Sequence, residues 1–117
     1  MRKILIADDE RIERQGIRSL LERKDYNLEI LEAGNGKEAL EIARSQKPDI
    51  LLSDIKMPFM TGLELMEKVR QFDSEMAIII FSGYSDFEYA RLAIKYGVMG
   101  YVLKPVNPSE FYNVIDK

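Results

Sequence analysis

The sequence predicts an α/β protein in which five β-strands alternate with five α-helices, a (βα)5 arrangement. Short apolar runs alternate with longer amphipathic stretches along the 117 residues. Most of the runs are apolar at nearly every position, which is typical of parallel strands covered on both faces. The alternation favours right-handed crossovers and a doubly wound parallel sheet with helices on both sides.

The five apolar runs are expected to be the strands. They are KILIA at residues 3–7, LEIL at 28–31, ILLS at 50–53, AIIIF at 77–81 and YVL at 101–103. The expected strand order is 2-1-3-4-5, the flavodoxin-like order, in which a ligand crevice lies at the carboxyl ends of the first and third strands.

The stretches between the strands are expected to be helices with one apolar face. The residues that define these faces are Ile12, Gly16 and Leu20; Ala39, Leu40 and Ala43; Leu63, Met66 and Val69 or Arg70; Ala90, Ala93 and Ile94; and Phe111, Val114 and Ile115. Asn35, Ser85 and Asn107 each stand three residues before a glutamate, which is the pattern of a helix N-cap. Pro108 suits a first helical position, and Gly97 suits a helix C-terminus.

The length predicts a single domain spanning residues 1–117. The last expected helix begins near Pro108 and has about three turns, which is short for a helix that closes the edge of a sheet. The sequence is therefore interpreted as a piece of a longer protein.

Composition excludes several function classes. The sequence has no cysteine and no histidine, which excludes disulfides, Ser-His-Asp and Cys-His nucleophile systems and histidine-ligated zinc. The net charge of −3 gives no basis for unaided nucleic-acid binding. No apolar run approaches the roughly 20 residues of a membrane helix, and the N-terminus lacks a signal-peptide core. A cytoplasmic protein is therefore expected.

Polar or charged residues follow four of the five expected strands. Asp8, Asp9 and Glu10 follow the first strand, Asp54 the third, Ser82 the fourth and Lys104 the fifth. These four strands are neighbours in the expected order, spaced about 4.8 Å apart, so the side chains should converge in one crevice.

The residue types in this crevice suit the binding of a phosphoryl group. Neighbouring carboxylates repel one another when ionised, and a bound cation relieves the repulsion. Oxygen ligands without nitrogen or sulfur favour Mg²⁺ over zinc. Mg²⁺, the amine of Lys104 and the hydroxyl of Ser82 together suit a phosphoryl group, with an aspartate as its nucleophile. Asp54 is the best candidate, because it stands alone on the central strand.

Four motifs along the whole chain, ILIADDE, LLSDIKMP followed by TGLEL, IIFSGYSD and GYVLKPV, resemble the receiver domain of two-component response regulators. The resemblance implies that Asp54 accepts a phosphoryl group from a histidine of a sensor kinase. It also implies that Asp8, Asp9, Asp54 and the backbone carbonyl of Lys56 hold Mg²⁺, and that Lys104 contacts the phosphoryl oxygens.

The same resemblance implies a phosphorelay switch with slow autodephosphorylation, and not a turnover enzyme. Ser82 would move to bond the phosphoryl group, Tyr101 would be the switch aromatic, and the Lys104–Pro105 peptide bond would be cis. These changes would reach the face of the fourth helix, fifth strand and fifth helix. That face would control homodimerisation or a DNA-binding output domain in transcription regulation. Tyr84 would lie beside the phosphoryl group and lengthen its lifetime.

The stretch FSGYSDFEYARLAIKYGVMGYVLKPV further resembles receivers that precede an AraC-type DNA-binding domain. In that case the output domain is absent from this chain, and any DNA contact is made through it.

Two other functions stay open. A Mg²⁺-dependent phosphohydrolase with an aspartate nucleophile typically has a second acid two residues on, where this chain has Lys56. A pseudo-receiver would keep the fold as a binding module and lose the chemistry. Each residue also has a plainer interpretation, since Asp8 and Asp9 can favour a helix N-terminus, and Asp54 can cap a turn.

Overall fold

The computed structural model describes residues 2–24, 26–83 and 87–116. Within them a parallel sheet has the order β2-β1-β3-β4-β5, which confirms the expected order and fold class. The strands are β1 (Arg2–Ala7), β2 (Leu28–Ala33), β3 (Ile50–Ser53), β4 (Ala77–Ser82) and β5 (Gly100–Leu103). The predictions for Ser85 as an N-cap and for Tyr84 beside the phosphoryl group lie outside the described residues.

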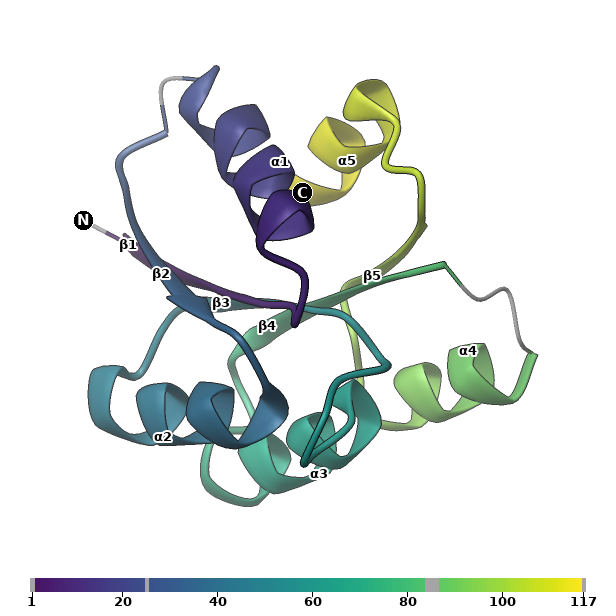
Figure 1. Cartoon of the computed structure of the whole chain (residues 1–117). Helices are drawn as coiled ribbons and strands as arrows, with labels where there is room; N and C mark the ends of the chain where they lie inside the picture. The colour runs from purple at the N-terminus through teal and green to yellow at the C-terminus, as the bar shows by residue number, and fades with distance from the viewer. Residues whose placement is uncertain (1, 25, 84–86, 117) are drawn as a thin grey trace.

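Helices cover both faces of the sheet (Figure 1). On one face lie α1 (Arg11–Glu22) and α5 (Pro108–Ile115). On the other lie α2 (Gly36–Gln46), α3 (Gly62–Phe72) and α4 (Phe87–Lys95). No helix in the described part of the chain is long and apolar enough to cross a membrane.

The core is divided into two hydrophobic clusters by the sheet. The cluster under α1 and α5 contains Ile4, Ile6, Ile17, Leu20, Leu21, Ile50, Leu52, Ile79, Phe81, Val102 and Phe111. The cluster under α2, α3 and α4 contains Leu5, Ala7, Leu51, Ile78 and Ile80 from the strands. Successive strand residues point to opposite faces, so a strand covered on both sides must be apolar at consecutive positions.

Side-chain caps fix several helix ends. Asn35 accepts a hydrogen bond from the backbone N–H of the third residue of α2 at 2.8 Å, and Asn107 does the same for α5 at 3.2 Å, which confirms both predicted N-caps. Gly97 follows α4 with φ +69°, a left-handed conformation that favours glycine. Sequence reasoning missed the capping box of α3, in which Thr61 and Glu64 each accept from the other's backbone N–H.

Three residues assigned to apolar helix faces are exposed instead, and one of them is Gly16 of α1. Ile12 is 82% exposed and Ile94 is 76% exposed. The face that α1 buries consists of Ile17, Leu20 and Leu21. Ile12 lies in the first turn of α1, before Ile17, which is the first residue that the helix buries. The spacing of apolar residues therefore predicted the helix α1 correctly but predicted the wrong residues for its buried face.

Candidate functional site

The four strands that precede the candidate residues end at the same edge of the sheet. Asp8 follows β1, Asp54 follows β3, Ser82 ends β4 and Lys104 follows β5. Backbone hydrogen bonds connect neighbouring strands here, from the Asp54 N–H to the Ala7 carbonyl at 2.9 Å and from the Lys104 N–H to the Ser82 carbonyl at 2.7 Å. The carboxyl edge therefore brings these residues together.

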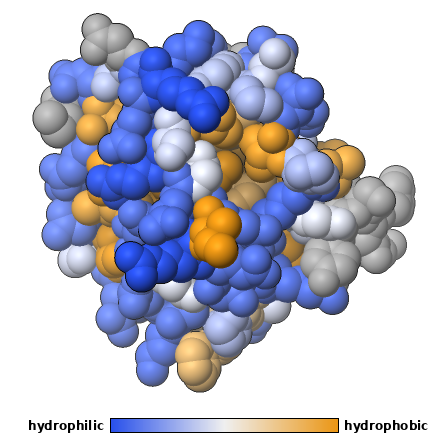
Figure 2. Space-filling model, turned by 45° about the horizontal axis from the view of Figure 1, so that its top comes forward, coloured by the Kyte–Doolittle hydropathy of each residue, from blue (hydrophilic) through white to orange (hydrophobic). Residues whose placement is uncertain are grey.

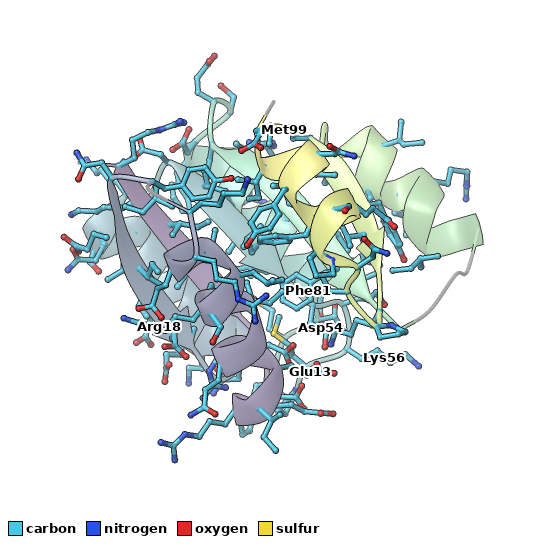
Figure 3. The ribbon with its side chains drawn as sticks, turned by 90° about the horizontal axis from the view of Figure 1, so that it is seen from above. Glu13, Arg18, Asp54, Lys56, Phe81 and Met99 are labelled. Atoms are coloured by element: carbon cyan, nitrogen blue, oxygen red, sulfur yellow. The ribbon has the colours of Figure 1, made fainter. Side chains whose placement is uncertain are left out.

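Lys104 lies at the centre of this group. Its Nζ atom is 3.1 Å from Asp8 Oδ2 and 3.0 Å from Asp54 Oδ2. It also forms an ion pair and hydrogen bond with Glu13 Oε2 from the first turn of α1. Figure 3 shows Glu13, Asp54 and Lys56 at the same end of the molecule. One ammonium therefore joins carboxylates from β1, β3 and α1.

Burial raises the pKa values of the two aspartates of the site, Asp8 and Asp54. Asp8 is fully buried and Asp54 is 7% exposed. Burial, and next the hydrogen bond with Glu13, raises the pKa of Asp8 to about 7. Burial also raises the pKa of Asp54, against the opposing effect of the Lys104 ammonium. A buried carboxylate is costly unless a charge compensates it, so both groups favour a nearby cation.

The pKa values of Glu13 and Lys104 are shifted so that both side chains favour their charged forms. Burial disfavours the ionised form of Glu13, yet hydrogen bonds with Asp8 and Lys104 outweigh this and lower the pKa of Glu13. Burial likewise disfavours the ammonium, yet hydrogen bonds to Glu13 and Asp54 raise the pKa of Lys104 above its ordinary value. Both residues are therefore charged near neutral pH.

The surroundings of Asp54 hold its carboxylate in one place. The Ile55 backbone N–H donates to Asp54 Oδ1 at 2.7 Å, so Oδ1 is fixed while Oδ2 faces Lys104. The first residue of α3, Gly62, packs directly on this loop, and its N–H donates to the Ile55 carbonyl at 2.7 Å. A Cβ at Gly62 would lie 2.0 Å from the Asp54 carbonyl oxygen, so this contact requires glycine.

An open pocket of about 480 Å³ lies over these side chains. It is lined by Asp9, Glu10, Glu13, Asp54, Lys56, Gly83 and Lys104. A separate groove of about 380 Å³ between α1 and the β5–α5 loop is lined mostly by apolar residues. Figure 2 shows hydrophobic side chains in a hollow surrounded by hydrophilic surface. Glu13 and Lys104 line both pockets, so they lie where the polar and apolar surfaces meet.

The oxygen atoms of Asp8, Glu13 and Asp54 can lie within 4.8 Å of one another, close enough to share a metal ion. Two of these three residues, Asp8 and Asp54, belong to the predicted Mg²⁺ ligand set. The other two predicted ligands, Asp9 and Lys56, are exposed and line the polar pocket. Carboxylate oxygens are the donors that Mg²⁺ prefers, so the residues present fit this ion. Sequence reasoning missed Glu13, which lies in the first turn of α1.

The remaining predicted residues lie on β4 and β5. Ser82 is fully buried at the end of β4. Tyr101 pairs with Ile80 across the sheet and is half-buried against the core cluster under α2, α3 and α4. The Lys104–Pro105 peptide bond is cis. Ser82 and Tyr101 are therefore on neighbouring strands, and Tyr101 lies on the face opposite to α1 and α5.

Comparison with known proteins gives one consistent result. The response regulator receiver domain family matches residues 4–116. The chain is 41% identical over 118 residues to the uncharacterized transcriptional regulatory protein YesN of Bacillus subtilis, covering 100% of this chain and 32% of that protein. It is 35% identical to the transcriptional regulatory protein HptR of Staphylococcus aureus, covering 100% of this chain and 46% of that protein. The chain thus spans 32% of the length of one relative and 46% of the length of the other.

Solved structures agree with the sequence relatives. The REC domain of AraT, a response regulator from Geobacillus stearothermophilus, is 41% identical with a TM-score of 0.90, covering 98% of this chain and 90% of that one. A two component transcriptional regulator AraC from Clostridium phytofermentans is 35% identical with a TM-score of 0.84, covering 99% and 90%. Together with the family match, these likenesses show that the chain belongs to the receiver domains of two-component response regulators.

Proposed function

We propose that this domain is a phosphorylation switch in which Asp54 accepts a phosphoryl group from a histidine of a sensor kinase. The observation that carries the proposal is the position of Asp54, which is buried, lines the polar pocket and has its Oδ2 atom 3.0 Å from Lys104 Nζ. An oxygen of the Asp54 carboxylate forms a bond to phosphorus as the phosphorus–nitrogen bond of the phosphohistidine breaks and the imidazole leaves. The chain has no histidine of its own, which suits a donor from another protein.

Lys104 and the acidic residues have separate roles in this proposal. The Lys104 ammonium stabilises the negative charge of the transferring phosphoryl oxygens. Asp8, Asp9, Asp54 and the Lys56 carbonyl would hold Mg²⁺, which neutralises phosphoryl oxygens when it is bound. The buried, repelling carboxylates of Asp8 and Asp54 support a cation at this position.

The signal then passes from β4 and β5 to the face of α4, β5 and α5. Ser82 would hydrogen-bond the phosphoryl group, and Tyr101 would turn inward. Ser82 lies at the end of β4 beside β5, and Tyr101 lies on β5, so a change at one can alter the packing of the other. Phosphorylation would shift the population between two packings of this face.

The output is proposed to be homodimerisation or release of a DNA-binding domain in a cytoplasmic response regulator. The support comes from relatives that are named transcriptional regulators and are about two to three times as long as residues 1–117, as the 32% and 46% coverage indicates. In this proposal the domain catalyses its own phosphorylation and slow autodephosphorylation, and contacts DNA only through the additional domain.

The test uses acetyl phosphate as a small donor and measures the intact mass of the domain. The wild type is expected to gain one phosphoryl group in the presence of Mg²⁺ and none without it. Asp54→Ala should abolish the gain, whereas Asp116→Ala, an exposed acid outside the pocket, should retain it. Continuous release of phosphate would support a phosphohydrolase instead, and the absence of any adduct would support a pseudo-receiver.

A further inference from the structure

The hydrogen-bonding capacity of Lys104 is fully used in the unphosphorylated site. A lysine ammonium has three N–H donors and accepts no hydrogen bonds. Carboxylates of Asp8, Glu13 and Asp54 take these donors in the structure. A phosphoryl oxygen can therefore be bonded by Lys104 only if one of the three carboxylates gives way.

The three carboxylates differ in their freedom to move. Asp8 is fully buried, and its Oδ1 accepts the Glu10 backbone N–H at 2.9 Å. Asp54 is the proposed acceptor, and its Oδ1 is held by the Ile55 N–H. The Glu13 side chain is 32% exposed, compared with 0% for Asp8 and 9% for Asp54.

Glu13 also has the longest side chain of the three and comes from a helix, not from a strand end. It lies at the boundary between the polar pocket and the apolar groove beside α1. A change of rotamer can carry its carboxylate into solvent, where hydration replaces the lost hydrogen bonds with Lys104 and Asp8. It is thus the partner of Lys104 that is released at the lowest cost.

We infer that Glu13 is a positioning residue that holds Lys104 in the unphosphorylated site and competes with the phosphoryl group for it. The inference rests on the proposed phosphorylation of Asp54. The Glu13 carboxylate opposes phosphorylation in two ways, by occupying a donor of Lys104 and by repelling the incoming negative charge. Glu13 therefore sets how readily the site is phosphorylated.

The substitution that tests this is Glu13→Gln, which keeps the size of the side chain and removes its charge. With acetyl phosphate and Mg²⁺, the rate of phosphorylation should rise about fivefold, the size expected for releasing a partly exposed ion pair. Binding of beryllofluoride, a phosphoryl analogue, should tighten by a similar factor. A merely structural role would lower the unfolding temperature and leave the beryllofluoride affinity unchanged.

Two matched variants separate the effect of the Glu13–Lys104 contact on the phosphorylation rate from the general effect of removing a negative charge. Glu22→Gln removes the same charge at the far end of the same helix, where Glu22 pairs with Arg18, and should behave as the wild type. Glu10→Gln removes a charge from the same pocket and should have a smaller effect than Glu13→Gln.

An unchanged or slower rate in Glu13→Gln would overturn the inference, as would an equal gain in Glu10→Gln. If the wild type itself takes no phosphoryl group, the proposed function fails first. If the wild type is phosphorylated on Asp54 and Glu13→Gln matches it, only the role of Glu13 fails.

Discussion

A partly buried cation lies at the amino ends of the strands and another at their carboxyl ends. The first donates to neutral carbonyls, and the second donates to carboxylates. At the amino edge, Arg70 from α3 donates to the backbone carbonyls of Met76 at 2.7 Å, Tyr96 at 2.8 Å, and Asp73 and Gly97 at 3.2 Å. At the carboxyl edge, Lys104 donates to three carboxylates. Arg70 joins segments of the chain through neutral acceptors, whereas Lys104 leaves a surplus of negative charge.

This difference separates a contact that joins segments of the fold from a contact at the proposed phosphorylation site. The carbonyls around Arg70 accept its hydrogen bonds without leaving a surplus of charge. The carboxylates around Lys104 include two that burial makes costly to ionise. An edge with uncompensated charge stabilises the fold less and binds a cation or rearranges more readily.

The largest effect is expected from Lys104→Met. Phosphorylation by acetyl phosphate should slow by about 10²–10³-fold, the usual cost of removing a donor that stabilises transition-state charge. Lys37→Met, on the exposed surface of α2, should retain the wild-type rate. A Lys104→Met domain that is folded and phosphorylated at the wild-type rate would remove Lys104 from the proposed chemistry.

Arg70→Met tests the other edge and should act on stability alone. The free energy of unfolding should fall by about 2–3 kcal/mol, because several partly buried carbonyls lose a charged donor. Chemical denaturation measures this loss, and the phosphorylation rate per folded molecule should change little. Arg44→Met, which removes a guanidinium over the Phe72 ring, should cost less than about 1 kcal/mol. Equal losses in the free energy of unfolding for the two variants would mean that the hydrogen bonds of Arg70 do not stabilise the fold more than an exposed cation does.

Asp8→Asn should stabilise the domain when Mg²⁺ is absent. The pKa of Asp8 is about 7 in the fold and 3.8 unperturbed, so the unfolded chain loses this proton first. The Asp8 contribution to stability therefore falls as the pH rises from about 4 to 7. At pH 8, Asp8→Asn should raise the free energy of unfolding by roughly 2 kcal/mol and should weaken the stabilisation by added Mg²⁺. A variant less stable than the wild type under these conditions would contradict the account of this edge.

Tyr26→Phe should have the smallest effect. The Tyr26 hydroxyl donates to Asp116 Oδ1 at 2.5 Å, and burial followed by this hydrogen bond raises the pKa of Tyr26 to about 12. Its loss should cost about 1 kcal/mol near neutral pH. The Tyr26 contribution is complete below about pH 10 and is lost as the pH rises toward 12, so wild type and variant should converge there. A constant difference between them up to pH 12 would rule out this linkage.

The sequence allowed the fold and part of the site to be predicted, for a physical reason. Parallel strands put their carboxyl ends at one edge, so the residues after each apolar run, such as Asp54 and Lys104, converge whatever the details of packing. Glu13 could not be placed in the same way, because the face that a helix turns toward the sheet depends on how it packs. The error for Ile12 has the same cause.

The contacts of Arg70 were also beyond the sequence. Its position on the apolar face of α3 was recognised only as an alternative to Val69. The carbonyls that it reaches belong to two loops, at residues 73–76 and 96–97, whose relative position is fixed only by the tertiary fold.

The central claim is that the phosphoryl group arrives at Asp54, and chemical trapping of the acyl phosphate tests it most directly. The domain treated with acetyl phosphate and Mg²⁺ is reduced with borohydride, which converts a phosphorylated aspartate to homoserine, and its peptides are then weighed. The account predicts homoserine at position 54 alone, and no conversion when Mg²⁺ is omitted. Homoserine at another acid, with Asp54 unmodified, would contradict it.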